Sequence, residues 1–291
     1  MHEPCRVLVP KKVDLDVCGA AYLLGVTREE EVEVLRGDAS PSDLFDPDVW
    51  CIEVGGAGRI DLNNWDHHGP EAEGLRSATL QVFYRCWVSA STLPRRQLVN
   101  YIDRLDVEGP RALGQSPGFP TLSDVFSGML LVTRDSVEQL HRGVEILCKV
   151  VQEEIDPFGR MPVEKIPQWA TFAEAKAEND RQMAEAVKSA QWTETSSGLK
   201  LGFLETRFWG APGALYGQGA QVVVVLNPNF HGTRKATIAG NDIRVDAVLP
   251  RLSELEPGWG GPATGTILGS PREEGTKLFL EEIVDIVKKT L

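Results

Sequence analysis

Short apolar runs separated by polar turns fill the first part of the chain. The first of them, Arg6-Val7-Leu8-Val9, is closed by Pro10 and followed by a polar turn at 11–16. Runs of this length between turn residues are typical of buried strands. Four segments are therefore predicted strands: 6–9, 32–35, 49–54 and 64–66. Helical patterning over 19–24 and 77–90 alternates with them, and this rhythm predicts a parallel α/β sheet.

The middle of the chain has the spacing of amphipathic helices. Between 135 and 154 apolar residues recur three or four positions apart, and a charged, alanine-rich segment follows from 164 to 191. Such patterns are typical of a helical layer packed along one face. We interpret this part of the chain as a helical connector beside or between two domains.

After residue 196 the pattern returns to strands. Two strong apolar runs, 199–204 and 221–226, predict strands. Two shorter runs, 236–239 and 243–246, flank a Gly240-Asn241-Asp242 turn. A last helix is expected from about 273 to 289, so this region is predicted to be a smaller α/β domain. The predicted domains are 1–130 for the parallel-sheet domain, 131–195 for the connector and 196–291 for the C-terminal domain.

Composition and charge limit the classes of function. With 42% hydrophobic and 25% charged residues, the 291-residue chain can build two ordinary cores. A net charge of -12 argues against nonspecific coating of DNA, but allows a short oligonucleotide in a metal-loaded cleft. The five cysteines are scattered and form no Cys-x-x-Cys pair, which argues against a zinc knuckle or disulfide framework. No signal-peptide pattern and no membrane-length apolar run is present, so a cytoplasmic protein is expected.

Acidic residues stand where several predicted strands end. Asp14 and Asp16 follow the first strand, Glu53 closes the third, and Asp66 closes the fourth. The carboxyl ends of strands in a parallel sheet meet at one edge. We therefore expect these distant carboxylates to come together in space.

Two adjacent histidines follow one of these acids directly, in the tripeptide Asp66-His67-His68. One imidazole can bind a metal ion while the other contacts a substrate, and the preceding carboxylate can orient a ring. Carboxylate oxygens with one imidazole suit Mn²⁺ or Mg²⁺ better than zinc. Two such ions about 4 Å apart can hold both the attacking and the leaving oxygen of a phosphoryl group.

Simpler interpretations exist for several of these acids. Asp14 or Asp16 could cap the helix that follows, a position that aspartate favours. Asp61, in the loop after the third strand, could serve in place of Glu53.

Two further acids, Asp103 and Asp106, lie three residues apart on a predicted helical face. We expect one of them to be a metal ligand, and the sequence leaves open which. Either could instead pair with one of the arginines nearby in the sequence, Arg95, Arg96 or Arg104.

These positions, taken in order, resemble the motifs of the DHH phosphoesterases. That family of two-domain enzymes includes inorganic pyrophosphatases, exopolyphosphatases, RecJ-type exonucleases and nanoRNA phosphatases. The segment 13–20 is similar to the first motif, an Asp-x-Asp followed by a small-residue helix start. Glu53 stands in the place of the second-motif aspartate, Asp66-His67-His68-Gly69 matches the signature, and Asp103 or Asp106 would be the fourth motif.

The resemblance implies roles for these residues in a metal centre. The implied metal ligands are Asp14, Asp16, Glu53, Asp66, His67 and one of Asp103 and Asp106. Asp66, His67 and His68 are the implied catalytic residues, with Asp66 orienting and His68 facing the substrate.

The C-terminal region resembles the substrate-binding domain associated with this family. Its glycine-rich loop is matched by 258–261, where the backbone amides of Gly260 and Gly261 are expected to bind an anion. Arg234, Lys235 and Arg244 are the expected phosphate anchors. A solvated basic turn and a plain tight turn are the simpler alternatives for these two segments.

Three positions depart from the family's pattern. Pro10 stands where a histidine usually precedes the first motif, Glu53 replaces an aspartate, and Pro262 ends the glycine loop where a histidine is frequent. Proline cannot bind a metal ion. The number of bound ions, one or two, is therefore left open.

We predict a Mn²⁺- or Mg²⁺-dependent phosphohydrolase that acts on a small phosphoester or phosphoanhydride. The expected substrates are a short oligonucleotide, with nucleic-acid binding and exonuclease activity, a phosphorylated nucleotide or polyphosphate. The alternative is a non-hydrolysing protein that binds a metal ion or nucleotide at a degenerate site. A homodimer is left open.

Overall fold

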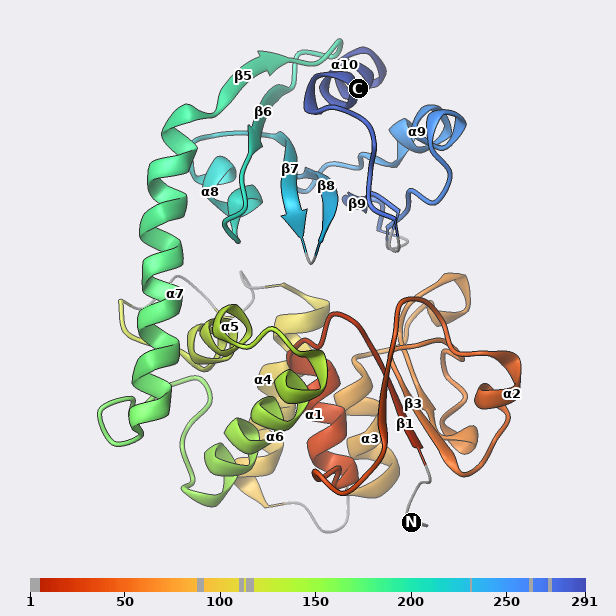
Figure 1. The fold of residues 1–291 in the computed structure, drawn as a ribbon, viewed down its shortest axis with the longest axis vertical. Helices are drawn as coiled ribbons and strands as arrows, with labels where there is room; N and C mark the ends of the chain where they lie inside the picture. The colour runs from red at the N-terminus through yellow and green to blue at the C-terminus, as the bar shows by residue number, and fades with distance from the viewer. Residues whose placement is uncertain are drawn as a thin grey trace. The chain divides into compact units, whose positions relative to one another are not determined.

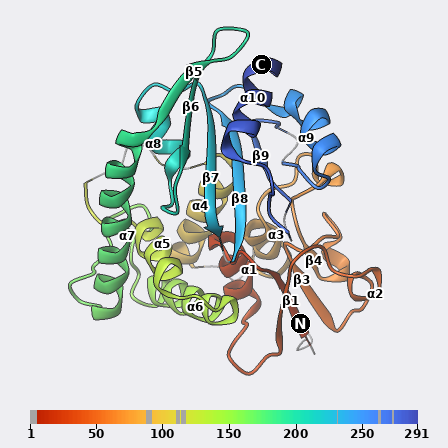
Figure 2. The same ribbon diagram turned by 45° about the horizontal axis from the view of Figure 1, so that its top comes forward.

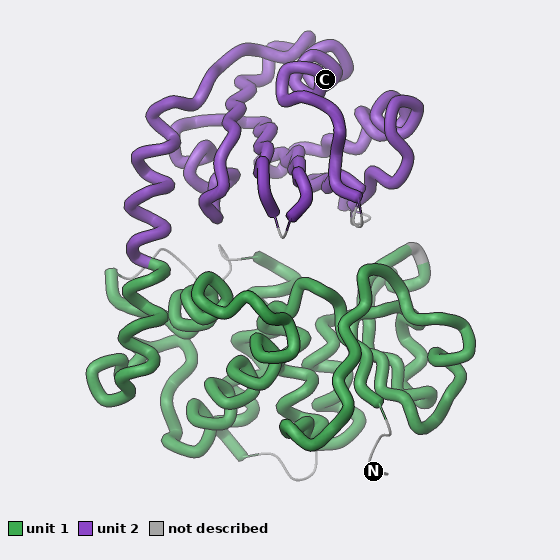
Figure 3. Tube along the Cα trace, in the orientation of Figure 1, with its two compact units in different colours: residues 1–176 green, residues 177–291 purple. Residues whose placement is uncertain are grey.

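The computed structural model describes residues 6–87, 92–109, 113, 118–230, 232–261, 264–271 and 274–291. The chain forms two compact units, Met1–Lys176 and Ala177–Leu291 (Figure 3). The division between them falls inside one long helix, α7 (Pro167–Ala186).

The first unit is built on a parallel sheet with the order β2-β1-β3-β4. Its strands are β1 (Arg6–Pro10), β2 (Val32–Leu35), β3 (Val49–Ile52) and β4 (Asn64–Trp65). Side chains alternate across the sheet, as the pleat requires. Val7 and Val9 point into the main helical core, whereas Leu8 lies in a smaller cluster on the other face.

Helices cover this sheet (Figure 1). They are α1 (Leu15–Leu24), α2 (Pro41–Leu44), α3 (Ala78–Cys86), α4 (Leu93–Val107), α5 (Leu122–Val132), α6 (Ser136–Gln152) and the start of α7, with short 3₁₀ turns η1 (Ile60–Leu62) and η2 (Pro70–Ala72). Helix α1 is apolar on nearly every side, which is typical of a fully buried helix. It packs against α3 and α6 in the main core.

Helix α1 begins at Leu15, four residues before the start that the sequence predicts. Asp14 caps it by accepting a hydrogen bond of 3.2 Å from the backbone N–H of Val17. The polar turn expected at 11–16 is therefore shorter, and Asp16 belongs to the first turn of the helix. Helix α3 begins after its cap Ser77, as expected, while the predicted helical end at 88–90 lies outside the described residues.

The second unit is a mixed sheet with the order β5-β6-β7-β8-β9 (Figure 2). Its strands are β5 (Gln191–Glu194), β6 (Lys200–Glu205), β7 (Val222–Phe230), β8 (Thr233–Gly240) and β9 (Ile267–Gly269). Only the β6–β7 pair is parallel among these described strands. Helices α9 (Leu249–Leu255) and α10 (Leu280–Thr290) pack on one face, and α8 (Ala211–Gly217) with the end of α7 packs on the other.

The turn predicted at 240–242 follows a strand but does not lead into a second one. Strand β8 ends at Gly240 and pairs with β7 and β9, and the segment 243–246 forms no strand. At Gly240 a Cβ atom would lie 2.1 Å from the carbonyl oxygen of Ile243, so the chain folds back tightly and buries Val245 in the core instead. The last helix also begins later than predicted, at Leu280.

The two sheets with their covering helices confirm the expected α/β fold. Within the part of the chain that the structure describes, no helix is both long enough and apolar enough to cross a membrane.

Candidate metal centre

Asp16 is held in the first turn of α1 by the start of α3. Its two carboxylate oxygens accept hydrogen bonds from the backbone N–H groups of Ala78 (2.7 Å) and Thr79 (2.9 Å). The positive end of the α3 dipole therefore points at a carboxylate that is only 1% exposed. This approach requires Gly19, where a Cβ atom would lie 2.2 Å from Oγ1 of Thr79.

Glu53 follows β3 in an unusual backbone conformation. Its φ is +57°, in the left-handed region that residues with a side chain rarely adopt. Its N–H donates to the carbonyl of Trp65 at 2.8 Å, and its carboxylate is nine-tenths buried or more. Such strain persists only where the surroundings enforce it, and it is frequent at functional sites. Asp61, the alternative acid, lies exposed in η1 and is not part of this group.

Asp66 and His68 form a pair directly after β4. One oxygen of Asp66 accepts the N–H of Gly55 at 2.7 Å, and the other accepts the N–H of His68 at 2.8 Å and lies 3.0 Å from its Nδ1. Burial alone would raise the pKa of Asp66, but these hydrogen bonds outweigh it and lower that pKa. The carboxylate thus fixes the His68 ring, which is 46% exposed and open to a ligand.

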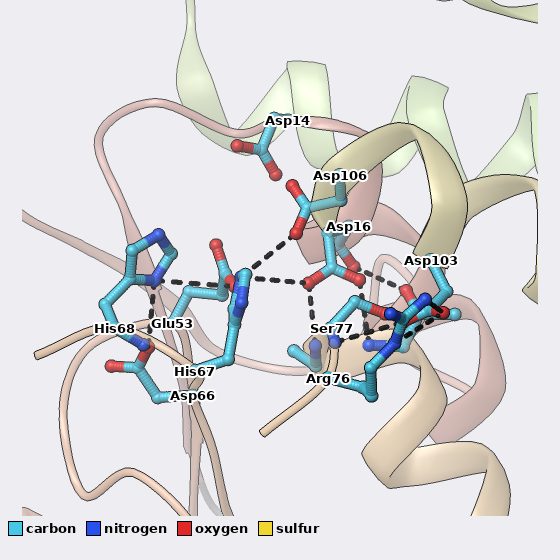
Figure 4. Close-up of polar contacts among 12 residues, drawn as sticks. Asp14, Asp16, Glu53, Asp66, His67, His68, Arg76, Ser77, Asp103 and Asp106 are labelled. Carbon is cyan, nitrogen blue, oxygen red and sulfur yellow. Dashed lines mark hydrogen bonds and ion pairs between the residues drawn. The ribbon is translucent and has the colours of Figure 1, made fainter. Parts of the chain in front are cut away.

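His67 lies among carboxylates from three different parts of the chain (Figure 4). Its Nε2 is 3.0 Å from Oε1 of Glu53, 3.0 Å from Oδ2 of Asp106 and 3.9 Å from Oδ2 of Asp16. Among the described residues, these Nε2, Oε1 and Oδ2 atoms of His67, Glu53 and Asp106 are buried without a well-aligned hydrogen bond. Buried polar atoms seldom lack partners, and a cluster of them around one point fits a bound cation.

The pKa values of the clustered side chains also fit a bound cation. Burial would lower the pKa of His67, but the nearby carboxylates of Asp106 and Glu53 raise it to about 11. Burial, then the charge of Asp106, raises the pKa of Asp16 to about 6, and burial raises that of Glu53 well above its ordinary value. Without an ion the cluster therefore retains protons, and a divalent cation could take their place.

Asp103 and Asp106 both lie on α4 but face different partners. Asp106 reaches His67, whereas Asp103 forms a two-pronged ion pair with Arg76 and accepts the N–H of Ser77 at 3.2 Å. Asp103 therefore holds the start of α3, the same helix end that binds Asp16. Arg76 was not singled out from the sequence, because it lies 27 positions away from its partner.

Two groups of side chains in the described part of the chain could hold a metal ion: Glu53 with His67 and His68, and Asp16 with His67 and Asp106. Within each group the ligand atoms lie within 4.8 Å of one another. Oxygen ligands with an imidazole suit a hard or borderline divalent ion. Asp14, which caps α1, and Asp66, which holds His68, belong to neither group.

The basic residues expected to bind phosphate lie in the second unit, and each has a partner there. Arg234 lies over the ring of Phe279, and Lys235 donates to the carbonyl of Ser270 at 2.9 Å. Arg244 forms an ion pair with Asp246.

The glycine-rich loop is packed into the sheet of the second unit. Gly260 exchanges backbone hydrogen bonds of 3.1 and 2.7 Å with Gly269, so its N–H already has an acceptor. At Gly261 a Cβ atom would lie 2.0 Å from the carbonyl oxygen of Ile267, which explains the glycine by close approach. Pro262 lies outside the described residues.

Comparison with known proteins yields similarity in structure alone. No family model and no curated protein matches the sequence. Among solved structures, the pGpG-specific phosphodiesterase PggH from Vibrio cholerae is 14% identical, with a TM-score of 0.56 over 91% of this chain and 92% of that one. The DHH domain of a member of a family of ribosomal proteins is 14% identical, with a TM-score of 0.43 over 98% and 85% of the two chains.

The likeness shows the class of fold alone: an α/β protein with two sheets, each covered by helices. The particular structure that carries this comparison is PggH, whose chain is matched over nearly its whole length.

Proposed function

We propose that this chain is a divalent-metal-dependent phosphohydrolase that cleaves a small phosphodiester. The observation that carries the proposal is the position of Nε2 of His67, 3.0 Å from two buried carboxylate oxygens that lack hydrogen-bond partners among the described residues. The fold shared with PggH supports a phosphodiester of the size of pGpG as the substrate class.

The ion would be held by His67 with Glu53, Asp106 and Asp16, and Mn²⁺ is the ion that this mixed donor set suits. When bound, such an ion supplies charge neutralisation for the phosphate and lowers the pKa of a water molecule. The chain's own groups fix its place: the start of α3 holds Asp16, and the strained backbone aims the carboxylate of Glu53.

His68 is the proposed contact to the scissile phosphate. Its ring is half-exposed, and Asp66 fixes its orientation through Nδ1, which leaves Nε2 as the nitrogen that contacts a phosphate and that donates a hydrogen bond to it when the ring is protonated. In the second unit, Arg234 and Lys235 are the proposed anion-binding residues. The Phe279 ring, over which Arg234 lies, is a neutral group with which a phosphate competes well. The charge of Arg244 is already neutralised by Asp246.

The test is a hydrolysis assay with a panel of substrates. Purified protein is given pGpG, short oligonucleotides, pyrophosphate and polyphosphate, each with Mn²⁺, with Mg²⁺ and with EDTA. We expect turnover of the dinucleotide with Mn²⁺ and none with EDTA. Failure to release product from any member of the panel, or turnover that a chelator leaves unchanged, contradicts the proposal.

A second candidate is a protein that binds such a ligand without cleaving it. It is favoured by the ion pair between Lys12 and Asp14 at 3.6 Å, and by Pro10 at the end of β1, which offers no ligand atom from its side chain. This candidate predicts tight binding of pGpG, measured by calorimetry, with no product in the same samples. Steady product release excludes it.

The raised pKa values of Asp16 and His67 make the stability of the metal-free protein depend on pH. A group whose pKa is raised on folding stabilises the folded state fully below its unfolded pKa, and this contribution is lost as the pH rises through the folded pKa. For Asp16 the window runs from 3.8 to about 6, and for His67 from 6.5 to about 11. The metal-free protein should therefore lose stability as the pH rises through these windows.

Mn²⁺ is expected to act in the opposite direction, because it binds the deprotonated ligands. At a free concentration of 100 times Kd it adds about 2.7 kcal/mol, which corresponds to about 5–10 °C in Tm. Thermal unfolding with Mn²⁺ and with EDTA measures this increase in Tm. We expect the full increase at pH 8 and a much smaller one at pH 5. An equal increase at both pH values would show that protonatable ligands such as His67 do not hold the ion.

A further inference from the structure

The two potential ligand groups share one residue, His67. The atom that lies near Glu53, Asp106 and Asp16 is its Nε2. An imidazole nitrogen has a single lone pair, so Nε2 binds one ion at a time. His67 can therefore ligate an ion in only one of the two groups at a time.

A second observation, besides the number of acidic side chains, indicates a ligand site around His67. The carboxylate of Glu53 is 5% exposed, and its Oε1, which lies 3.0 Å from Nε2 of His67, has no well-aligned hydrogen bond among the residues that the structure describes. A buried oxygen in this state costs free energy unless a cation or a proton meets it.

Asp14 is the acid that could serve a second ion, and its carboxylate is already engaged. One oxygen accepts the N–H of Val17 as the cap of α1, and the other lies 3.6 Å from Nζ of Lys12. Asp14 is absent from both ligand groups found in the described chain. Pro10, at the end of the neighbouring strand β1, adds no ligand atom from its side chain.

Lys12 brings a positive charge to this side of the centre. Its Nζ lies 3.6 Å from Oδ2 of Asp14, and a lysine ammonium group carries its charge at neutral pH. Its side chain is largely exposed, so Nζ can pair with Asp14 or turn toward an incoming anion.

We propose that the centre binds a single divalent ion through His67 and the carboxylates around it, and that Lys12 is a built-in cation that takes the place of a second ion beside Asp14. This inference rests on the proposed metal-dependent function and deepens it. A phosphate entering the centre would meet one ion and one ammonium group, and Lys12 becomes a substrate-binding residue of the site.

The experiment counts bound Mn²⁺ per chain by equilibrium dialysis and elemental analysis. The samples are the wild type, Lys12→Met, Lys11→Met and His67→Ala, with thermal unfolding of each to verify the fold. Lys11→Met is the matched control, since it removes the same charge one position away, from a side chain that lines a separate hollow with Glu31 and Asp135.

We expect one ion per chain in the wild type and in Lys11→Met, and none at this centre in His67→Ala. Lys12→Met should bind a second ion at raised Mn²⁺ concentration, because Oδ2 of Asp14 no longer faces an ammonium group and water can complete the coordination of a hard cation held by one or two carboxylates. The count should therefore rise from one to two in this variant.

Each of the remaining outcomes contradicts a different part of the proposal. Two ions in the wild type refute the single-ion centre. One ion in the wild type with no second ion in Lys12→Met refutes the role of Lys12 and leaves the metal-dependent function standing. No ion in the wild type removes the metal centre itself, so the proposed function fails together with this inference.

Discussion

Replacing His67 by alanine is expected to abolish Mn²⁺ binding at the centre and to lower phosphodiester hydrolysis by about 10³-fold or more. His67 supplies the nitrogen at the middle of the cluster, 3.0 Å from both Glu53 and Asp106. Its loss removes this nitrogen ligand and leaves the carboxylates of Glu53 and Asp106 facing each other without a positive charge, which lowers the stability of the metal-free protein. Initial rates with saturating Mn²⁺ and bound Mn²⁺ per chain measure the two effects.

A loss of folding must be separated from a loss of ligation in this variant. His67→Gln keeps a polar side chain of similar reach but is a poor ligand, so we expect the same loss of hydrolysis with a smaller change in Tm. A matched pair of acids tests the same centre: Glu53→Ala should lose the ion, and Asp61→Ala, exposed in η1, should not. Hydrolysis that survives His67→Ala and His67→Gln would rule out this centre as the active site.

Substituting Gly19 by alanine is expected to destabilise the first unit and to weaken ion binding, although residue 19 touches no ion. The new Cβ would lie 2.2 Å from Oγ1 of Thr79 and 2.8 Å from Cδ1 of Ile102. Overpacking of this kind costs about 1–3 kcal/mol. Because Thr79 and its neighbour donate to Asp16, moving α3 away from α1 also loosens a proposed ligand.

We expect Mn²⁺ affinity to fall by about 10- to 100-fold in Gly19→Ala, the range for loss of a group that orients a ligand. The control is Gly213→Ala in α8, where no atom lies within 4 Å of the new Cβ. That variant should be neutral or slightly stabilised, since alanine favours a helix over glycine. Unchanged Mn²⁺ affinity in Gly19→Ala, measured by calorimetry, would show that the α1–α3 contact does not position Asp16.

The sequence could predict much of the first unit because its signals are local. Each strand is a short apolar run between turn residues, and the order of strand and helix limits the unit to a parallel sheet with helical cover. The positions of Glu53 and of Asp66-His67-His68 at strand ends already indicated that these residues would gather at one edge. The structure does bring Glu53, His67, Asp16 and Asp106 together.

Other features of the centre depend on contacts between distant segments, which no local pattern encodes. Spacing on α4 could not choose between Asp103 and Asp106, since both point from the same helix. Which of the two reaches His67 depends on Arg76, which lies before α3 and forms an ion pair with Asp103. The left-handed backbone of Glu53 likewise arises from how β3 and β4 pair, and glutamate gives no sequence signal for it.

In the second unit too, some elements could be predicted from the sequence and others could not. The strong runs of β6 and β7 were readable, but the weaker segment 243–246 lies outside the sheet. Its apolar residues are buried by α9 and α10 and not by strand pairing. An apolar run indicates that its residues will be buried. Whether they are buried in a strand or in another conformation depends on how the neighbouring elements pack.

The sequence by itself thus determined the class of fold and the chemical types available to the centre, because periodicity and residue identity are carried by each segment alone. Tertiary structure decided which of those groups meet: Asp106 with His67, and Asp103 with Arg76. These pairings depend on where buried backbones place their side chains, to within the few ångströms over which charges and ligand atoms act.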